Sequence, residues 1–393
     1  MHVALVGPCS PADVVDLLDG QDAVEAMRVP GYRGIPVSEL AKGLVAAGHQ
    51  VTVVTTDAAL PSPAIEFSGP RFHIVIQRSR PRPRDYLRDL YTCERRAMGE
   101  VLRGAAPDMV HAHWTYEFEL AAQDSGLPHV TTAHDAPFAI LRQMRDPYRA
   151  ARLGVALRAR PGIRHLSAVS PYMADRWRRQ MRYRGPISVI PNSIPQSAVA
   201  PSRRPSLHPT VLEVADSGRR KNIRGLLRAF AIVRLQVPQA ELRLVGPGLG
   251  ALEPLASWAS DQGMASGVSF VGPLGRAQLA EEYSRAWLFA HASLEESFGL
   301  TVLEALASGL PVVGGRDSGG VPFVLGDGLA GCLTDVSDAG VFAGAMTALI
   351  ADGPPALPLG ATRYIEENFS LQSVTEKYVA KYKGALAGDR SAT

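Results

Sequence analysis

Residues 290–313 read AHASLEESFGLTVLEALASGLPVV, and this stretch decides the fold of the chain. A buried strand is expected to end near Ala290, followed by a polar loop and by a helix that begins at Gly299 and ends near Gly309. The apolar pair at 312–313, just after a proline, indicates a second strand. A strand, a loop, a helix and another strand form the repeating unit of a parallel sheet with helical crossovers.

The rest of the chain repeats this alternation in two series. The first has expected strands at 3–6, 51–55, 72–77, 108–112, 129–132, 166–169 and 187–190, with helices near 36–47 and 85–103. The second has expected strands at 211–214, 241–245, 268–271, 287–290 and 312–313, with a helix at 223–236. We therefore predict an α/β protein with two doubly wound domains.

The expected boundary between the domains is rich in proline. Residues 195–209 contain four prolines and no periodic pattern, which is typical of a linker. We predict an N-terminal domain at 1–195, a linker at 196–209 and a C-terminal domain at 210–369, with a final helix at about 370–387 that packs back on the first domain. Two such domains facing one another form a cleft at the carboxyl ends of their strands, where ligands bind.

The composition of the 393 residues describes a globular protein, with 46% hydrophobic and 20% charged residues. No run of about 18 uncharged apolar residues occurs, so no membrane-spanning helix is expected. The N-terminus lacks the basic start and long apolar core of a secretory signal. The cysteines, Cys9, Cys93 and Cys332, are scattered, as expected for reduced thiols in a cytoplasmic protein.

The net charge of +3 hides an asymmetry between the two halves. Residues 1–200 hold 24 Arg and Lys against 19 Asp and Glu, whereas the remainder holds 17 against 19. Most of the excess lies at 142–184, where 12 arginines face only Asp146 and Asp175. This segment indicates an anionic partner, such as a phosphorylated or lipid-linked acceptor or the inner membrane face, or else a solvated basic surface. No aromatic-interleaved patch accompanies it, so nucleic acid is not an expected partner.

The turn into the helix at Gly299 offers a binding site. Backbone N–H groups at 298–301 lie where a helix leaves them without internal partners, and the helix dipole adds positive charge, so a diphosphate can bind there. Glu296 precedes the helix and would repel a phosphate unless it faces another group, such as sugar hydroxyls. Glu304 lies about two turns into the helix and is either a second ligand for hydroxyls or a surface or ion-paired residue.

The run ESFGLTVLEALASGLPVV, which begins at Glu296, resembles the E-x7-E signature of the retaining GT-B glycosyltransferases, notably the large family numbered four. The resemblance extends over nearly the whole chain. It implies two Rossmann-like domains that face one another across a cleft, the second of which binds a nucleotide-sugar donor. It places Glu296 near the donor hexose and Glu304 on the ribose hydroxyls. The other residues that it places on the donor at this turn are Ser297, Phe298, Gly299, Leu300 and Thr301.

Two further segments of the second domain resemble the same family. Arg219-Arg220-Lys221-Asn222 lies between the first strand and first helix, where the resemblance implies that Lys221 neutralises the donor phosphates. The family's usual arginine lies upstream, where this chain has Asp216, so Arg220 or Arg219 is expected to replace it. Gly272-Pro273-Leu274 ends a strand and resembles the loop that contacts the nucleotide base.

In the first domain the resemblance points to a glycine loop and a histidine. Gly31 and Gly34 precede the helix at 36–47, where the family brings backbone close to the donor; a flexible turn is the alternative. His134 follows the strand at 129–132, where a family histidine contacts the donor sugar or its leaving phosphate; a structural role is the alternative. His111 and His113 flank the preceding strand and are expected to be structural rather than to line the acceptor site.

The resemblance implies transfer of a hexosyl group to a hydroxyl acceptor with retained anomeric configuration, with Glu296, His134 and Lys221 as catalytic residues. No Asp-x-Asp occurs in the sequence, so transfer without a metal ion or another cofactor is expected. A nucleotide-sugar epimerase on the same fold and a catalytically inactive binding protein are the alternatives. A dinucleotide oxidoreductase is disfavoured, because the glycine-bearing turns at 7–10 and 246–250 lack G-x-G-x-x-G.

Overall fold

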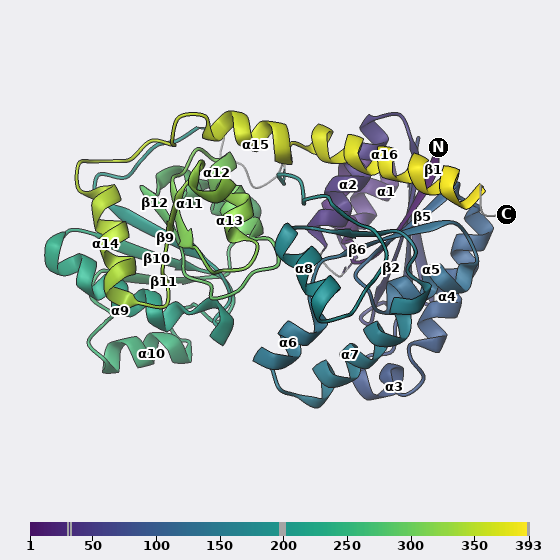
Figure 1. The fold of residues 1–393 in the computed structure, drawn as a ribbon, viewed down its shortest axis with the longest axis horizontal. Coiled ribbons are helices and arrows are strands. Elements are labelled where there is room, and N and C mark those ends of the chain that lie inside the picture. Colours follow the sequence, from purple (N-terminus) through teal and green to yellow (C-terminus); the bar gives the residue numbers. More distant parts are fainter. Residues whose placement is uncertain (30, 32–33, 196–201, 391–393) are drawn as a thin grey trace. The chain divides into compact units, whose positions relative to one another are not determined.

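The computed structural model describes residues 1–29, 31, 34–195 and 202–390, and it divides into two compact units (Figure 1). The first unit contains Met1–Ser193 and Leu371–Thr393, and the second contains Ile194–Ser370. Residues 196–201 of the expected linker lie outside the described residues. Its later part belongs to the second unit and packs on it, since Arg203 donates to Ala286 O at 2.7 Å and Trp287 Nε1 donates to Ser206 O at 2.8 Å.

The first unit is built on an eight-stranded sheet with the order β3-β4-β2-β1-β5-β6-β7-β8. Neighbouring strands are parallel except β3 and β4. Every strand expected in the first series is present, and β3 is an additional one that the sequence did not predict. The strands are β1 (His2–Val6), β2 (Gln50–Asp57), β3 (Ala64–Gly69), β4 (Phe72–Arg78), β5 (Met109–His113), β6 (His129–Ala133), β7 (Leu166–Ala168) and β8 (Ile187–Val189).

Alternate residues of β1 enter two different cores, because successive side chains of a strand point to opposite faces. Val3 and Leu5 pack with α2 (Ile35–Ala46) and α16 (Leu371–Arg390). Ala4 and Val6 pack with α4 (Thr92–Ala105) and α5 (Glu117–Ser125). The central strand is therefore buried on both faces, as in doubly wound folds.

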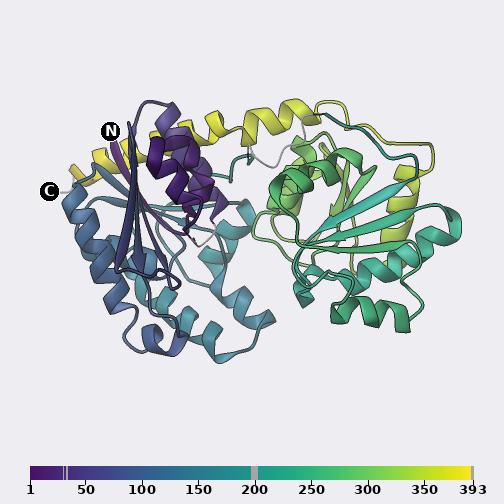
Figure 2. The same cartoon turned by 180° about the vertical axis from the view of Figure 1, so that it is seen from behind.

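The C-terminal helix α16 lies beside α2, although the two are far apart in the sequence (Figure 2). Gly43 of α2 permits this close approach, because a Cβ at this position would clash with Thr375 Oγ1 of α16. The core on this face of the sheet contains Val374, Tyr378 and Tyr382 of α16. The C-terminal helix is thus an integral part of the first unit.

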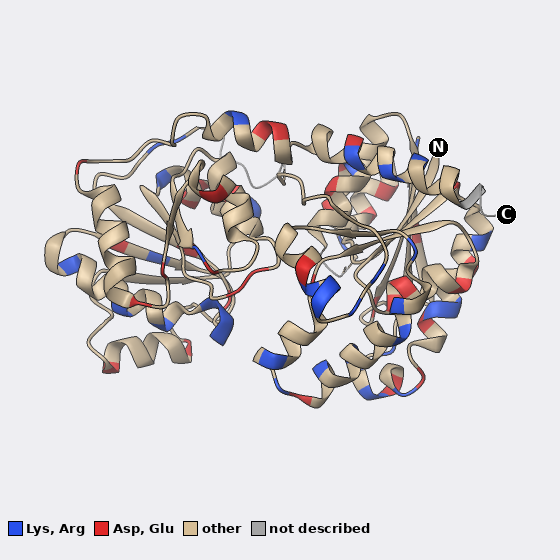
Figure 3. Ribbon diagram, viewed as in Figure 1, with Lys and Arg blue, Asp and Glu red and all other residues tan. Residues whose placement is uncertain are grey.

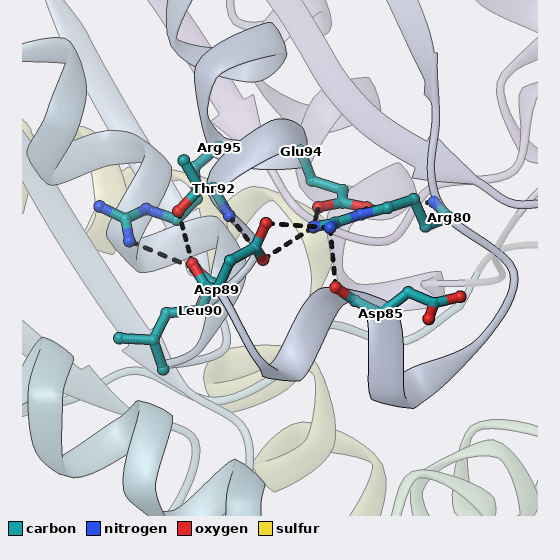
Figure 4. Close-up of polar contacts among 7 residues, drawn as sticks. All are labelled: Arg80, Asp85, Asp89, Leu90, Thr92, Glu94 and Arg95. Atoms are coloured by element: carbon teal, nitrogen blue, oxygen red, sulfur yellow. Dashed lines mark hydrogen bonds and ion pairs between the residues drawn. The ribbon is translucent and has the colours of Figure 1, made fainter.

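The helix expected at 85–103 is broken in two, α3 (Pro83–Leu87) and α4, by left-handed backbone at Leu90 (φ 53°) and Tyr91 (φ 61°). Figure 4 shows how Arg80 holds this break. Its guanidinium donates to both carboxylate oxygens of Asp89, at 2.9 Å each, and to Glu94 at 2.6 and 2.9 Å. Because Glu94 is buried, its charge requires a cationic partner of this kind.

The remaining helices of the first unit are α1 (Gly20–Ala26), α6 (Pro137–Gln143), α7 (Pro147–Ala159) and α8 (Pro171–Arg179). Helices α6, α7 and α8 carry most of the arginine-rich segment, which is visible as blue ribbon in Figure 3. None of the helices that the structure describes is both long and apolar enough to cross a bilayer.

The second unit is a six-stranded, fully parallel sheet with the order β11-β10-β9-β12-β13-β14. The strands are β9 (Thr210–Val214), β10 (Glu241–Val245), β11 (Val268–Gly272), β12 (Leu288–His291), β13 (Val312–Gly315) and β14 (Cys332–Thr334). All five strands expected in the second series are present, and β14 is additional. The helices are α9 (Ile223–Gln236), α10 (Pro254–Asp261), α11 (Arg276–Arg285), α12 (Leu300–Ala307), α13 (Val321–Val324), α14 (Ala339–Ile350) and α15 (Ala361–Phe369).

Strands β9 and β12 are neighbours at the point where the strand order reverses. The chain leaves β9 toward β10 on one side of the sheet, and it leaves β12 toward β13 on the other. The connections that follow β9 and β12 therefore run to opposite sides of this point, and parts of the two loops lie together above the carboxyl ends of the strands. In open α/β sheets this switch point is where ligands bind.

Candidate functional site

Side chains from the two loops at the switch point meet one another. The loop after β9 carries Arg220 and Lys221, and the loop after β12 carries Glu296. Lys221 Nζ donates to Glu296 Oε1 at 2.6 Å, and Arg220 Nη1 donates to Glu296 Oε2 at 3.1 Å. Leu294 N also donates to Arg220 O at 2.8 Å, which joins the two backbones. The structure thus brings together three of the residues that the sequence predicted for the site.

The carboxylate of Glu296 is ionised although its side chain is buried. Burial alone would raise its pKa, but Lys221, Arg220 and His291 outweigh that effect and hold the pKa at about 2. Two cations, Arg220 and Lys221, contact the single carboxylate of Glu296, so these three side chains together carry a net positive charge. A site of this kind can bind an anion beside a carboxylate that accepts hydrogen bonds.

The backbone around Glu296 is fixed by the segment that follows β13. Glu296 N donates to Ser318 O at 3.3 Å, and Gly320 N donates to Glu296 O at 2.8 Å. The two segments touch so closely that a Cβ at Gly320 would lie 2.5 Å from Ser297 O. A glycine is therefore required here for Glu296 to reach the switch point.

Helix α12 begins just after this loop, and its first turn presents unpaired donors. Gly299, at the N-cap, has φ 99°, a conformation that glycine adopts readily and other residues avoid. Within the described part of the chain, the N–H groups of Phe298, Gly299, Leu300 and Thr301 donate to no backbone carbonyl. Phe298 is buried against Phe369, with ring centroids 5.8 Å apart, so the turn is held in place. Donors arranged in this way at a helix N-terminus can bind an anion.

Glu304 lies on α12 in a contact separate from the Lys221–Glu296 pair. Its side chain is buried, and Tyr283 of α11 donates to Glu304 Oε2 at 2.9 Å. Burial raises the pKa of Glu304 to about 7, against the opposing effects of Tyr283 and Arg276. The predicted ribose ligand is therefore a carboxyl group that changes charge near neutral pH.

Two buried residues behind Glu296 were missed by the sequence analysis. His291 Nε2 lies 3.7 Å from Glu296 Oε1, and His291 Nδ1 lies 3.5 Å from Glu213 Oε1. Glu213 also accepts a hydrogen bond from Ala292 N at 2.8 Å. Both side chains are fully buried. The signal was present in the sequence, because Glu213 interrupts the apolar run of a central strand, where a charge needs a partner.

In the predicted glycine-containing loops, the backbone conformation or close packing explains why glycine is present. Gly272 ends β11 with φ 80°, and Gly272 N donates to Leu249 O at 3.0 Å, which joins the loop of Pro273 and Leu274 to the loop after β10. In the first unit, a Cβ at Gly34 would clash with Pro8 O, and one at Gly31 would lie 2.7 Å from Ser10 Cα. Residues 30 and 32–33 of that loop lie outside the described residues.

His134 belongs to a histidine cluster in the first unit. Its Nε2 lies 2.9 Å from His113 Nδ1, and its ring stacks on Trp114 with centroids 4.2 Å apart. His111 lies behind His113, with ring centroids 4.1 Å apart, and bonds Tyr382 of α16 at 2.7 Å. Burial lowers the pKa of His134 to about 3 and those of His111 and His113 well below their ordinary value, so all three rings are neutral.

Among the described residues, no group of three or more His, Cys, Asp or Glu side chains is placed to hold a metal ion. The groups of the second unit that have the chemistry to bind an anion are backbone N–H groups at the start of α12 and the cations of Arg220 and Lys221. The transfer expected to proceed without a metal ion or cofactor stays a prediction.

Comparison with known proteins places the chain in a family. Residues 198–365 match the family described as glycosyl transferases group 1, and residues 37–197 match the one described as glycosyltransferase family 4. The chain is 33% identical over 179 residues to a D-inositol 3-phosphate glycosyltransferase of Mycolicibacterium vanbaalenii, across 42% of this chain and 38% of that protein. It is 37% identical over 163 residues to one of Corynebacterium kroppenstedtii, across 39% and 36%. The matched stretch thus spans less than two-fifths of the length of these relatives.

Solved structures share the whole fold at low sequence identity. Sucrose-phosphate synthase from Thermosynechococcus elongatus superposes with a TM-score of 0.77 at 20% identity, covering 99% of this chain and 100% of that one. Anabaena HepE, solved in complex with UDP and glucose, gives 0.69 at 16%, covering 97% and 99%. These likenesses show the GT-B fold, and the two family matches, which adjoin at 197–198 and together span most of the chain, show that the chain belongs to the group 1 glycosyltransferases of the family 4 type.

Proposed function

We propose that this protein transfers a hexosyl group from a nucleotide-diphosphate sugar to a hydroxyl acceptor, with retention of anomeric configuration and without a metal ion. The observation that carries the proposal is the meeting of Lys221 and Arg220 with Glu296 at the switch point, just before the unpaired N–H groups of α12. Cations and a helix terminus suit the diphosphate, and the carboxylate suits sugar hydroxyls.

In the proposed reaction, the donor diphosphate lies against the first turn of α12 and accepts from Lys221, while Arg220 stays with Glu296. The acceptor oxygen forms a bond to the anomeric carbon as the bond from that carbon to the phosphate oxygen breaks. The acceptor's proton passes to the departing phosphate on the same face of the sugar, which accounts for retention. Lys221 and the helix N–H groups stabilise the charge that develops on the phosphate.

The remaining predicted residues complete the donor site. Glu304 would accept hydrogen bonds from the ribose, and the loop of Gly272, Pro273 and Leu274 would contact the base. His134 in the first unit would contact the donor sugar or its leaving phosphate. The neighbour solved with UDP and glucose supports a nucleotide-sugar donor.

The experiment that tests the proposal is a thermal-shift screen against UDP-, GDP- and ADP-sugars, followed by turnover with the donor that stabilises the protein. The product's anomeric configuration by NMR tests retention, and an inverted product would refute it. Undiminished turnover in EDTA is expected, and loss restored by Mn²⁺ or Mg²⁺ would refute metal independence. Epimerisation of the donor without acceptor would identify an epimerase, and binding without any turnover would identify an inactive binding protein.

For the acceptor, we propose a molecule that carries an anionic phosphate, bound by arginines of the first unit. A hollow of about 570 Å³ opens among α6, α7 and α8. Its lining combines cationic and partly exposed apolar side chains: Phe138, Arg142, Leu157, Arg160, Arg179, Gln180 and Arg182. Arginine recognises phosphate through paired N–H donors, and the curated relatives are named for an inositol phosphate.

The same chemistry could be offered by a free phosphorylated acceptor or by an anionic lipid headgroup, and two assays separate these sources. Turnover is compared between D-inositol 3-phosphate and inositol, and co-sedimentation between phosphatidylglycerol and phosphatidylcholine vesicles. A double variant, Arg142→Gln with Arg179→Gln, should lose the preference for the phosphorylated acceptor or the preference for anionic vesicles. The control Arg84→Gln, which removes a charge elsewhere in the unit, should keep both preferences. Equal behaviour of all three proteins in both assays would contradict the proposal.

A further inference from the structure

His113 is a buried side chain with one satisfied ring nitrogen and one unsatisfied one. Its Nδ1 lies 2.9 Å from His134 Nε2, whereas its Nε2 has no hydrogen-bond partner among the described residues. The side chain comes from the end of β5, and His134 follows the neighbouring strand β6. The contact therefore joins two adjacent strands at the carboxyl edge of the sheet.

The site is built to hold His113 in this position. Gly7, which follows β1, faces it closely: a Cβ there would lie 2.9 Å from His113 Cβ. On the other side, the His111 ring packs against His113 and is itself tied to Tyr382 of α16 and to Thr132 Oγ1, both at 2.7 Å. These neighbours pack against His113, and in this arrangement its Nδ1 faces His134.

The unsatisfied nitrogen decides which ring donates. Both rings are neutral, so each carries one proton, and one of the two facing nitrogens must donate to the other. If His113 carried its proton on Nε2, a buried N–H would be left without an acceptor. If the proton is on Nδ1, only the lone pair of Nε2 is left without a partner. Buried N–H groups without an acceptor are rarer in proteins than buried acceptors without a donor. His113 Nδ1–H therefore donates, and His134 Nε2 accepts.

We propose that His113 is a positioning residue that fixes the tautomer of His134, so that His134 presents a protonated Nδ1 as a neutral hydrogen-bond donor. Among the described residues no group bonds this Nδ1. Trp114, with φ 65°, stacks on the His134 ring and fixes its plane, so the direction of the donor is set as well. That this donor serves a leaving phosphate or sugar oxygen rests on the proposed function; the tautomer itself does not.

The tautomer can be read directly by NMR of the full protein labelled with ¹⁵N-histidine, with the His134 signals assigned by their loss in His134→Gln. We expect His134 to show a protonated Nδ1 and an unprotonated Nε2 in the absence of any ligand. A protonated Nε2 on His134 would overturn the proposal. This result does not depend on whether a variant of His113 folds, because His113 is unchanged in the measured protein. If instead the proposed function is wrong, the protein will show no turnover with any donor, while the His134 spectrum will still show the expected tautomer.

A pair of variants tests whether His113 sets this state. His113→Asn keeps a donor close to the position of Nδ1, whereas His113→Leu removes it. We expect His113→Leu to lose the single His134 tautomer and to lower kcat about tenfold, and His113→Asn to restore much of both. If His113→Leu is folded and leaves the His134 spectrum unchanged, His113 is merely structural. Equal loss in both variants would also contradict the donor role.

Discussion

Lys221 and Glu296 are 75 residues apart in the sequence, and their charged atoms lie 2.6 Å apart at the switch point of the second sheet. The pair joins the loop after β9 to the loop after β12, so a group proposed to bind phosphate and a group proposed to bind sugar hydroxyls are in direct contact. A diphosphate that accepts from Lys221 competes with Glu296 for the same ammonium group. We therefore expect donor binding to redistribute the hydrogen bonds of Glu296 toward the sugar.

Replacing Glu296 by glutamine should separate binding from turnover. Gln keeps the shape of the side chain but removes the charge, so Lys221 and Arg220 become available to the diphosphate. We expect nucleoside diphosphate affinity to be unchanged or higher and kcat to fall about 100-fold, measured by calorimetry and steady-state kinetics. The neighbouring change Glu295→Gln serves as the control and should leave kcat within a factor of about 3. Equal kcat in both variants would remove Glu296 from the reaction.

The stability of the protein should depend on pH through Glu304. Burial raises its pKa from 4.5 to about 7 in the folded protein, so the protonated form is favoured on folding. This contribution is fully present below about pH 4.5 and is lost as the pH rises through about 7. Between about pH 5 and pH 8 the wild type should therefore lose on the order of 2–3 kcal/mol of unfolding free energy that Glu304→Gln does not lose. Urea denaturation at both pH values measures this difference, and parallel curves would contradict the raised pKa.

Gly299→Ala should disturb the first turn of α12. With φ 99° at this N-cap, a side chain costs about 1–2 kcal/mol and shifts the N–H groups that are proposed to bind the diphosphate. We expect a lower midpoint of unfolding together with weaker nucleotide binding. Gly344→Ala is the matched control, because it lies inside α14 with open space around it and should be neutral or stabilising by up to about 1 kcal/mol. Full nucleotide affinity in Gly299→Ala would show that this turn does not bind the diphosphate.

Arg80→Ala should destabilise the first unit. It leaves Glu94 buried without a cation and frees the break between α3 and α4, at a cost of about 2–3 kcal/mol in unfolding free energy. The matched control is Arg84→Ala. The Arg84 side chain is exposed and forms only a long ion pair with Asp85, at 3.7 Å, so its removal should lower the unfolding free energy by less than about 0.5 kcal/mol. Chemical denaturation measures both. Equal losses in the two variants would mean that the Arg80 network is no more than a surface feature.

The sheets could be predicted because their buried strands leave a strong local pattern. The apolar runs at β1, β9 and β10 are bounded by turns and alternate with helices, which is sufficient for a doubly wound fold. The hairpin strand β3 was missed because it pairs antiparallel at the sheet edge and is only partly buried, so its residues lack the apolar run of the central strands. The break at Leu90 and Tyr91 was missed because a left-handed backbone there depends on Arg80, Asp89 and Glu94 meeting in space.

At the candidate site, the residues that local motifs mark could be predicted, but their partners could not. Glu296 and Lys221 stand in recognisable segments, whereas their pairing across 75 residues follows only from the strand order. His291 and Glu213 are single polar residues in buried strands, and only the folded structure shows that they are neighbours. The bond between His113 and His134 likewise depends on β5 and β6 being neighbours.

The switch point of the second unit is proposed to bind a nucleoside diphosphate through Lys221 and the first turn of α12. Calorimetric titration with UDP, GDP and ADP tests it on the wild type, on Lys221→Ala and on Lys383→Ala, which removes an exposed lysine of α16. We expect the wild type and Lys383→Ala to bind one of these nucleotides with equal affinity, and Lys221→Ala to bind it at least about tenfold more weakly. A wild-type protein that binds none of them, or a Lys221→Ala variant with undiminished affinity, would contradict it.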